Sequence, residues 1–600
     1  MIFYDFEVFK YDWMVCVIDT DSRRQFPIVN DREQLTRLYN EHHNDIWVGY
    51  NSKHYDQYIL KGILLGMNPK EINDWIIVER KEGWAFSNEF RRVPIINYDC
   101  MVGVNSLKRL EGFMGHDIRE TSVDFNIDRK LTKEEIDMTI KYCMHDVEET
   151  FEVFNRTIDV FNAMYGIVKA FDLPFKCIGD SEARITAKVL ECKKHDFGDE
   201  FDFTFEPCIQ IKKYHDVVEW FKGMQGAHPD DKKKFYKQSY KRMVAGIPHT
   251  FGFGGIHGAP AEPCYYDGAL YHVDVNNYYP SYLIAHNRVT RGATNDNYKK
   301  VYMTRKELKR KQRSAKTKAE AKKWKKAQLP YKKLLNALSG AMKDPNNPAY
   351  DPRMNNTMCI NGQLMLLDLI EHLEVIPGFV LIQSNTDGLI VKIPDNDEAF
   401  NMMDDICYEW ERRCSTDRCE ILLELDCIYK IYQKDVNNYL WIDLDGGLER
   451  KGAYVKELSP LDYDLPIVNE ALVNYMAHGT PIDKTINECN DLIKFQKIVK
   501  LSKNYDYVGH ETFNGIDIPS IKEYTYNCYR VFASKDAKDG RLLKFKKSKN
   551  KGEKFANTPD HCFIYNDDVT EEKVPRKLDK QYYIDIANVR LHDKKKGFGL

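Results

Sequence analysis

The chain has 600 residues, of which 43% are hydrophobic and 30% carry a charge, and its formal net charge at pH 7 is −3. A chain of this length is expected to form several domains, each with its own apolar core. The nearly neutral balance excludes a protein that is basic throughout, so any surface that binds nucleic acid must be local.

Neither secretion nor a membrane is indicated by the sequence. The fifteen cysteines form no C-x-x-C pair or other metal-ligand spacing, which predicts reduced thiols. The chain opens on a strand-like segment, without a basic region followed by an apolar one, and contains no apolar window of about eighteen residues. We therefore expect a cytoplasmic protein without a membrane partner.

The first predicted strand carries two acids on one face. Asp5 and Glu7 are two residues apart, so their side chains point to the same side of the strand. Two neighbouring carboxylates are unfavourable unless a metal ion lies between them. An ordinary edge strand is the alternative for this pair taken alone.

Two later segments place further acids beside or within predicted helices. The segment that ends at Asp56 precedes a helix expected over 57–65, and a longer helix is expected over 136–154. Within the longer helix, Tyr142 and Asp146 are four residues apart and lie on one face. That face alone also suits a helix exposed to solvent.

In chain order these segments read Asp-x-Glu, Asn-x-x-x-Tyr-Asp and Tyr-x-x-x-Asp. They resemble the three exonuclease motifs of the DEDD superfamily, in the tyrosine-bearing form of proofreading domains. The resemblance implies a 3′→5′ exonuclease in which Tyr142 orients the attacking water. It also implies two metal ions held by Asp5, Glu7, Asp56 and Asp146. The stretch Ser106–Leu110 resembles the lesser Ser-Leu-Lys motif that precedes the third exonuclease motif.

The region that follows, about 165–250, contains no pattern that indicates a chemical role. A helix is expected over 181–193 with Ser181 as its cap. Four glycines within 251–258 allow a phosphate backbone to approach closely, and a plain cluster of turns explains them equally well.

Two distant turns each carry an aspartate. The segment 271–281 has the pattern of a buried strand that runs into a tight turn, with Asp274 among its apolar residues. A lone buried carboxylate is costly, so Asp274 either caps the following helix or meets a cation. Residues 379–393 predict a hairpin whose polar turn carries Asp387, which also suits ordinary turn chemistry. On adjacent strands the two aspartates would hold a pair of Mg²⁺ ions for phosphoryl transfer.

A strongly basic segment lies between the two aspartates. Residues 299–333 contain sixteen Lys and Arg against two acids, and their composition predicts helix. Such a run is often a solvated face or a disordered arm. At its end, Lys332, Asn336 and Gly340 recur every four residues and therefore share a helix face.

These three segments, in this order, resemble motifs A, B and C of family B DNA polymerases. Residues 274–281 resemble motif A, Asp-x-x-Ser-Leu-Tyr-Pro-Ser, although Asn277 and Tyr278 replace the usual Ser-Leu. Tyr279 falls on the family's steric gate, the ring that leaves no room for a ribose 2′-hydroxyl.

Motif B resembles Lys-x-x-x-Asn-Ser-x-Tyr-Gly, with two smaller departures in this chain. The resemblance implies that Lys332 and Asn336 bind the incoming nucleotide, Lys332 as a point charge on the triphosphate. An upstream arginine is expected to assist, and both Arg310 and Arg313 are candidates.

The hairpin turn resembles motif C, Tyr-x-Asp-Thr-Asp-Ser, with Asn385 in place of the first Asp and Gly388 in place of the last Ser. Asp387 keeps the position of the direct metal ligand beside Asp274. The resemblance implies two Mg²⁺ ions in this site, as in the exonuclease site. Because Asn385 removes a charge, Mn²⁺ is the alternative ion.

Four further residues match DNA-binding elements of the family. Gly254 and Gly255 match a Gly-Gly element that contacts the template, and Lys451 and Tyr454 match a Lys-x-x-Tyr element that holds the primer terminus. The second element lies in the second of two strand-like runs, 436–443 and 448–455, whose Asp-Gly-Gly connection predicts a hairpin.

Residues after about 455 carry no motif of the family, and they resemble it only by their position in the chain. Helices are expected from about residue 457, followed by β structure around 524–532 and a basic stretch over 541–554. A thumb domain that grips duplex DNA by its phosphates has this character, and so does a surface loop. The final lysines, 594–596, are expected to fray.

The resemblance implies a multidomain α/β and α+β protein, in which a ribonuclease H-like exonuclease domain precedes a right-hand polymerase of palm, fingers and thumb. We expect a mixed sheet in the nuclease and an antiparallel sheet with helices in the palm. The implied ranges are 1–165 for the exonuclease, 166–265 for a connector, 266–290 for the palm with motif A, 291–345 for the fingers with motif B, 346–456 for the palm with motif C, and 457–600 for the thumb and C-terminal region.

The implied function is DNA-templated DNA synthesis with 3′→5′ proofreading, as in phage or viral genome replication in a host cytoplasm. The expected partners are primer–template DNA and deoxynucleoside triphosphates, with a monomeric protein and unidentified replisome components. Lys332 follows Asp274 by 58 residues and Asp387 follows Asn336 by 51, which leaves little room for the insertions of protein-primed phage polymerases. A nucleic-acid primer is therefore favoured. Because Asp5 is so near the start, we expect no extra N-terminal domain.

Two alternatives stay open. Asn385 also suits a 3′→5′ exonuclease with a decayed polymerase module. A non-catalytic protein that binds single-stranded DNA within a replisome would instead use the basic stretches, and would bind DNA equally well without metal ions.

Overall fold

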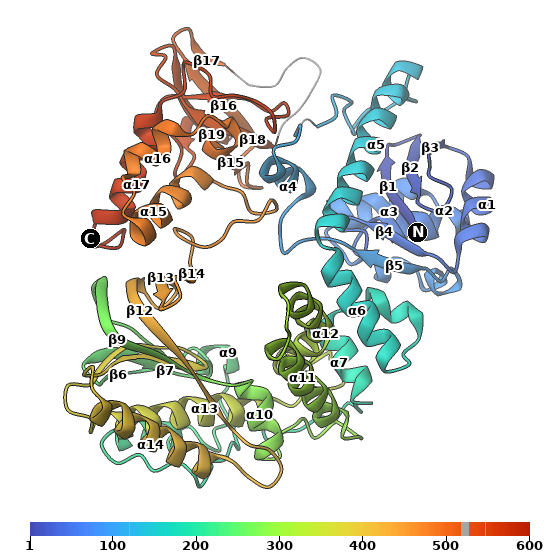
Figure 1. The fold of residues 1–600 in the computed structure, drawn as a ribbon. Coiled ribbons are helices and arrows are strands. Elements are labelled where there is room, and N and C mark those ends of the chain that lie inside the picture. The colour runs from blue at the N-terminus through green and yellow to red at the C-terminus, as the bar shows by residue number, and fades with distance from the viewer. Residues whose placement is uncertain (119, 518–526, 547) are drawn as a thin grey trace.

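The computed structural model describes residues 1–118, 120–517, 527–546 and 548–600. Within these residues, four β-sheets and their covering helices form three lobes (Figure 1). This arrangement confirms the predicted mixed α/β class with several domains. None of the described helices combines the length and the apolar character needed to cross a bilayer.

The first lobe contains a five-stranded sheet in the order β3-β2-β1-β4-β5. Its strands are β1 (Ile2–Val8), β2 (Trp13–Asp19), β3 (Arg24–Val29), β4 (Ile46–Gly49) and β5 (Ile96–Asp99). Its helices are α1 (Arg32–His42), α2 (Asp56–Leu65), α3 (Pro69–Asn73), α4 (Leu107–Met114) and α5 (Lys133–Arg156). β1 pairs antiparallel with β2 and parallel with β4, so the sheet is mixed, as predicted.

Alternation along β1 decides what each face of this sheet carries. Ile2, Tyr4 and Phe6 pack into one core, with residues of α2, whereas Phe3 packs on the other side, with residues of α5. Residues two apart share a face. Asp5 and Glu7 therefore lie on the α5 side of the sheet.

A helical connection follows, made of α6 (Ile158–Ala170), α7 (Glu182–Val189), α8 (His215–Lys222) and α9 (Lys232–Phe235). Ser181 caps α7 as predicted, because its hydroxyl accepts a hydrogen bond from Arg184 N at 3.3 Å. The helix predicted to reach 193 is too long. Glu191 has a positive φ of 48°, and Lys193 N donates to Gly292 O at 2.9 Å, so the chain leaves the helix there.

The largest sheet has nine strands in the order β14-β13-β12-β9-β11-β10-β8-β7-β6, and its described pairings are antiparallel, as predicted. Its strands are β6 (Tyr240–Val244), β7 (Ile247–Phe251), β8 (His257–Gly258), β9 (Cys264–Val275), β10 (Val380–Ser384), β11 (Gly388–Lys392), β12 (Leu423–Asp435), β13 (Asn438–Asp443) and β14 (Leu448–Lys451). The associated helices are α10 (Tyr278–Ala285), α13 (Pro352–Leu373) and α14 (Asp397–Cys414). Nearly all of α13 is buried, which makes it the central helix of this lobe.

The basic segment forms two helices, α11 (Asn297–Arg313) and α12 (Lys318–Lys343), which pack on each other and, through α12, on α6 and α7 (Figure 1). The predicted helical character is confirmed. Thr317 restarts the helix because its hydroxyl accepts a hydrogen bond from Glu320 N at 3.1 Å. α12 continues through Pro330 without ending there.

The C-terminal lobe combines three helices with two small sheets, β15-β18-β21 and β17-β16-β19-β20. Its helices are α15 (Pro466–His478), α16 (Ile482–Glu488) and α17 (Lys580–His592). Its strands are β15 (Lys497–Lys500), β16 (Tyr507–Thr512), β17 (Gly515–Asp517), β18 (Cys528–Ala533), β19 (Asp539–Lys546), β20 (Lys549–Lys554) and β21 (Cys562–Ile564).

Three predictions fall on this lobe. Residues 524–526 of the expected β stretch lie outside the described residues, and β18 accounts for most of the remainder. The basic stretch forms the hairpin of β19 and β20. The final lysines, 594–596, are exposed, and the fraying expected for them stays a prediction. Phe598, just after them, is 1% exposed, and its backbone N donates to Arg590 O at 2.8 Å.

Candidate active sites

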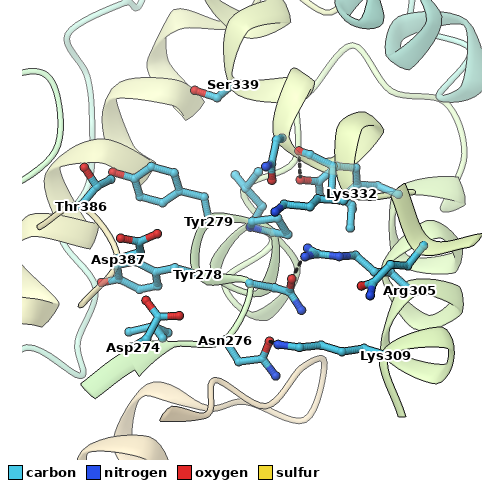
Figure 2. Close-up of a pocket in the computed structure, with 18 of the residues that line it drawn as sticks. Asp274, Asn276, Tyr278, Tyr279, Arg305, Lys309, Lys332, Ser339, Thr386 and Asp387 are labelled. Carbon is cyan, nitrogen blue, oxygen red and sulfur yellow. Dashed lines mark hydrogen bonds between the residues drawn. The ribbon is translucent and has the colours of Figure 1, made fainter. Parts of the chain in front are cut away.

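The two aspartates of the large sheet lie side by side. β9 and β11 are antiparallel neighbours in which Asp274 is opposite Gly388, and Val275 N donates to Asp387 O at 2.8 Å. The expected hairpin of β10 and β11 brings Asp387 to this position from more than one hundred residues away. Figure 2 shows both carboxylates on the same side of the cavity. Asp274 lies one residue before the end of β9 and faces a second carboxylate, and the N-cap position of α10 is Asn277, so Asp274 is not a helix cap.

Gly388, where the resemblance leads one to expect serine, is explained by this close approach. A Cβ atom at Gly388 would lie 2.8 Å from Val273 O and 3.1 Å from the Asp274 carboxylate. A side chain at this position would push β11 away from β9, so glycine permits the two aspartates to approach each other.

The electrostatics of the pair favour a bound cation. Burial, and then the negative charge of Asp387, raise the pKa of Asp274 to about 7. A divalent ion between the carboxylates would remove this repulsion, and carboxylate oxygens are the ligands that Mg²⁺ prefers. The donor set therefore fits a magnesium or manganese site.

A cavity of about 720 Å³ opens beside the pair and has opposite charges at its two ends. Asp274 and Asp387 lie at one end, and the cations approach from α11 and α12 at the other (Figure 2). The cationic side chains that line it include Arg305, Lys309 and Lys332. Asn336 and Tyr279 also line the cavity.

Neither predicted upstream arginine lies among the described residues that line this cavity. Arg310 and Arg313 line a neighbouring pocket instead, and Arg313 forms an ion pair with Glu424 at 2.7 Å. Arg305, one to two helical turns earlier, takes the place expected for them.

Arg305 was missed although the sequence contains a signal for it. Tyr298, Val301 and Tyr302 form the buried stripe of α11, and Arg305 continues that stripe at the next helical position. A cation at an apolar position needs a partner or a ligand. Arg305 is 8% exposed, it donates to the side chain of Asn277, and its Nε has no hydrogen-bond partner. Burial lowers the pKa of Arg305.

Asn277, the first departure from motif A, thus holds a cavity cation. It adopts a positive φ of 53°, a conformation that asparagine tolerates better than most residues. The preceding residue acts similarly, because Asn276 Oδ1 accepts a hydrogen bond from Lys309 at 3.1 Å. Both asparagines connect the strand that carries Asp274 to α11.

Tyr279 is held by its neighbours in the cavity wall. Its ring stacks on that of Tyr278, with ring centres 5.6 Å apart. A Cβ atom at Gly362 would lie 2.9 Å from the Tyr279 ring, so Tyr279 packs directly on the backbone of α13.

Asn385 is engaged within its own turn. Its backbone N donates to Gly388 O at 2.8 Å, its side chain accepts from Thr386 N at 2.9 Å, and it bonds to His257. Gly255 lies against the same turn, because a Cβ atom there would be 2.3 Å from the Thr386 hydroxyl.

The other proposed DNA-binding residues lie in different surroundings. A Cβ atom added at Gly254 would have no other atom within 4 Å. The charge of Lys451 helps to lower the pKa of His257, after burial, which places Lys451 near the Asn385 turn. Tyr454 instead packs beside α17, with the Arg590 guanidinium 4.5 Å from its ring centre.

The first lobe brings together a second group of acids. Asp5 and Glu7 extend from β1 toward α5, and Phe6 N donates to the Asp56 carboxylate at 3.1 Å. Burial, then Asp56, Glu7 and Asp146, raise the pKa of Asp5. Burial raises the pKa of Asp56 to about 7.

These four carboxylates are therefore close enough to repel one another, and they fit divalent cations for the same reason as the first pair. Tyr142 lies beside them, since burial and the charges of Asp146 and Glu7 raise its pKa.

Lys108 is an additional residue of this cluster, and the sequence analysis gave it no role beyond its place in the Ser-Leu-Lys stretch. Its Nζ lies 2.6 Å from an Asp146 oxygen, 3.1 Å from buried Glu111, and 4.8 Å from the centre of the Tyr142 ring. Lys108 therefore fixes the orientation of Asp146 from α4.

No protein-family model and no curated protein matches this sequence. Among solved structures, the chain is similar to the family B DNA polymerase of the hyperthermophilic archaeon Pyrobaculum calidifontis, with 14% identity and a TM-score of 0.41. The alignment covers 99% of this chain and 78% of the archaeal one. At this identity and TM-score the likeness assigns no function to the chain.

Proposed function

We propose that the protein is a DNA-directed DNA polymerase with a 3′→5′ exonuclease. One observation carries the proposal: the cavity of about 720 Å³ has a pair of aspartates at one end, and cations that include Arg305, Lys309 and Lys332 at the other. A nucleoside triphosphate needs this pairing, with metal ligands near its reactive phosphate and positive charge along the rest of the chain of phosphates.

Several residues that line the cavity have a role in this proposal. Asp274 and Asp387 hold two Mg²⁺ ions, with Mn²⁺ as the alternative. When bound, the ions lower the pKa of the primer 3′-hydroxyl and neutralise charge that develops on the phosphate. Arg305, Lys309 and Lys332 bind the triphosphate, and Asn336 lies one helical turn after Lys332.

Tyr279 limits the space for a 2′-hydroxyl, which would select deoxynucleotides. Its ring packs on the α13 backbone at Gly362 and stacks on Tyr278, which leaves it little freedom to move aside.

In the first lobe, Asp5, Glu7, Asp56 and Asp146 would hold the ions of the exonuclease, and Tyr142 would orient the attacking water. Lys108 would be a positioning residue because it contacts Asp146 and not the reacting atoms. Burial and mutual repulsion raise the pKa values of Asp5 and Glu7, and burial raises that of Asp56. Perturbed pKa values of this kind are common at functional sites, and they support the role proposed here.

We further propose the domain assignment stated for the sequence, with a ribonuclease H-like nuclease and a right-hand polymerase of the family B phage type. The protein would act as a monomer on primer–template DNA and deoxynucleoside triphosphates. Gly254, Gly255 and Lys451, which lie near the Asp387 turn, are the proposed DNA contacts, whereas the packing of Tyr454 makes it a weaker candidate.

A labelled primer–template incubated with Mg²⁺, with and without the four deoxynucleoside triphosphates, tests the proposal. We expect extension with nucleotides and shortening without them. Shortening under both conditions would instead support the second candidate, a nuclease with an inactive polymerase module, which Asn385 favours. Absence of both reactions would contradict both candidates.

A further inference from the structure

We propose that Glu424 is a latch residue, which holds cations of α11 while the nucleotide cavity is empty and competes with the incoming triphosphate for them. The inference rests on the proposed polymerase function, because the competing ligand is a nucleoside triphosphate. Nothing in the sequence motifs assigns a role to Glu424.

The geometry places Glu424 between the metal-binding strand and the fingers helix. Glu424 lies on β12, directly opposite Asp274 on β9. Its two oxygens lie 2.8 and 3.0 Å from Lys309 Nζ, and one of them lies 2.7 Å from the Arg313 guanidinium. Lys309 lines the cavity, so the cation that Glu424 holds is one that a triphosphate would meet.

Glu424 is charged in this arrangement. Partial burial opposes its ionisation, but the hydrogen bonds from Lys309 and Arg313 outweigh burial and lower its pKa. The pair with Lys309 is about three-quarters buried on both sides, and such a pair is less screened by salt than an exposed one.

A triphosphate entering the cavity would change this balance in two ways. Its phosphates would attract Lys309 away from a single carboxylate, because they carry more charge and more acceptor oxygens. The freed Glu424 carboxylate would at the same time repel the phosphates across a short distance. Both effects make nucleotide binding weaker than it would be without Glu424.

The arrangement also connects nucleotide binding to α11. Arg313 and Lys309 are one helical turn apart and bind the same carboxylate, so they fasten the C-terminal half of α11 to β12. Release of Lys309 would leave Arg313 as the remaining partner of Glu424. The latch therefore loosens and need not open fully.

Glu424→Gln tests the inference, and Glu420→Gln is the matched control. The control removes the same charge and also breaks an ion pair with α11, Lys306–Glu420 at 3.1 Å, but Glu420 is 64% exposed and neither partner lines the main cavity. The measurements are the KM and kcat for deoxynucleotide incorporation, together with equilibrium binding of a deoxynucleotide to enzyme on a primer–template that ends in a dideoxynucleotide.

We expect Glu424→Gln to lower the KM and the dissociation constant Kd of the nucleotide about threefold to tenfold, with kcat changed less than twofold. Glu420→Gln should leave KM and Kd within twofold of the wild type. In a Lys309→Gln background the effect of Glu424→Gln should become clearly smaller, because only the repulsion between Glu424 and the phosphates is left to relieve.

A KM that is unchanged or raised by Glu424→Gln, or an equal effect in the Lys309→Gln background, would overturn the latch. A large loss of kcat would also overturn it, since that result assigns Glu424 to the metal site. A wild-type protein that binds primer–template but no nucleotide would contradict the polymerase function itself, and the latch with it.

Discussion

At the scale of single residues, Arg305 is a buried cation of the cavity whose hydrogen bonding is incomplete. It is buried, its Nε lacks a hydrogen-bond partner, and burial lowers its pKa. A buried donor without a partner costs roughly 1–3 kcal/mol. A phosphate oxygen bound at this position would recover that cost.

Arg305→Gln should therefore raise the KM for deoxynucleotides roughly tenfold to a hundredfold, because a charge-assisted hydrogen bond to phosphate is lost. Steady-state incorporation kinetics measure the effect. Arg310→Gln, five residues further along the same helix and outside the cavity, is the control and should change KM less than twofold. Equal effects of the two substitutions would contradict the role given to Arg305.

Asp274 makes the stability of the metal-free protein depend on pH. Its folded-state pKa of about 7 is above the ordinary value of 3.8, so the folded state binds this proton more tightly. Protonated Asp274 therefore contributes to the free energy of unfolding. This contribution is fully present below pH 3.8 and is lost as the pH rises through about 7.

Asp274→Asn should abolish this decrease in stability with pH, because asparagine stays uncharged. In EDTA, the Tm of the variant should match that of the wild type near pH 4 and exceed it by roughly a few degrees at pH 8. Thermal unfolding across this pH range measures the difference. Added Mg²⁺ should raise the wild-type Tm more than that of the variant at pH 8. A Tm difference that does not change with pH would count against a buried, repelled carboxylate.

The carboxylates that the structure brings together could be predicted from the sequence because strands and helices impose fixed spacings on the residues that share a face. Asp5 with Glu7, and Tyr142 with Asp146, are set by the periods of a strand and a helix. Arg305 could not be assigned in the same way, since its partner Asn277 lies on a different element and only the packing of α11 brings them together.

At the scale of elements, α4 joins two lobes. Arg530, on β18 of the C-terminal lobe, is fully buried and donates to His116 O at 2.7 Å and Gly112 O at 3.3 Å, at the C-terminal end of α4. The same helix carries Lys108, which contacts Asp146. A cation at the C-terminal end of a helix is also favourable for the helix dipole.

Arg530→Met should therefore loosen the C-terminal lobe from α4 and slow the exonuclease. Since the substitution leaves several buried carbonyls without a donor, we expect roughly 3–5 kcal/mol of destabilisation. Thermal unfolding and limited proteolysis measure the first effect, and shortening of a labelled primer measures the second. Arg541→Gln, which breaks an exposed pair with Glu511, is the control and should have little effect on either. Faster proteolysis with an unchanged exonuclease rate would show that α4 does not couple the C-terminal lobe to the carboxylate cluster of the first lobe.

Helices and strands were predicted well where their periodicity is strong, and poorly where distant contacts decide them. The 136–154 helix and the hairpin around Asp387 are local patterns. The end of α7 depends on Gly292, and the burial of Phe598 depends on the core that it joins, neither of which lies in the local sequence.

At the scale of the whole molecule, the two carboxylate clusters lie in different lobes, on different sheets, and share no described side chain. We therefore expect two activities, each of which can be removed without loss of the other. A single site with two activities, or a protein that only binds DNA, would not behave in this way.

The most direct measurement compares Asp387→Asn with Asp5→Asn on one labelled primer–template in Mg²⁺. We expect Asp387→Asn to reduce extension roughly a thousandfold while shortening continues, and Asp5→Asn to reduce shortening by a similar factor while extension continues. Loss of both reactions in either correctly folded variant would contradict the assignment of synthesis to the large sheet and of primer shortening to the first lobe.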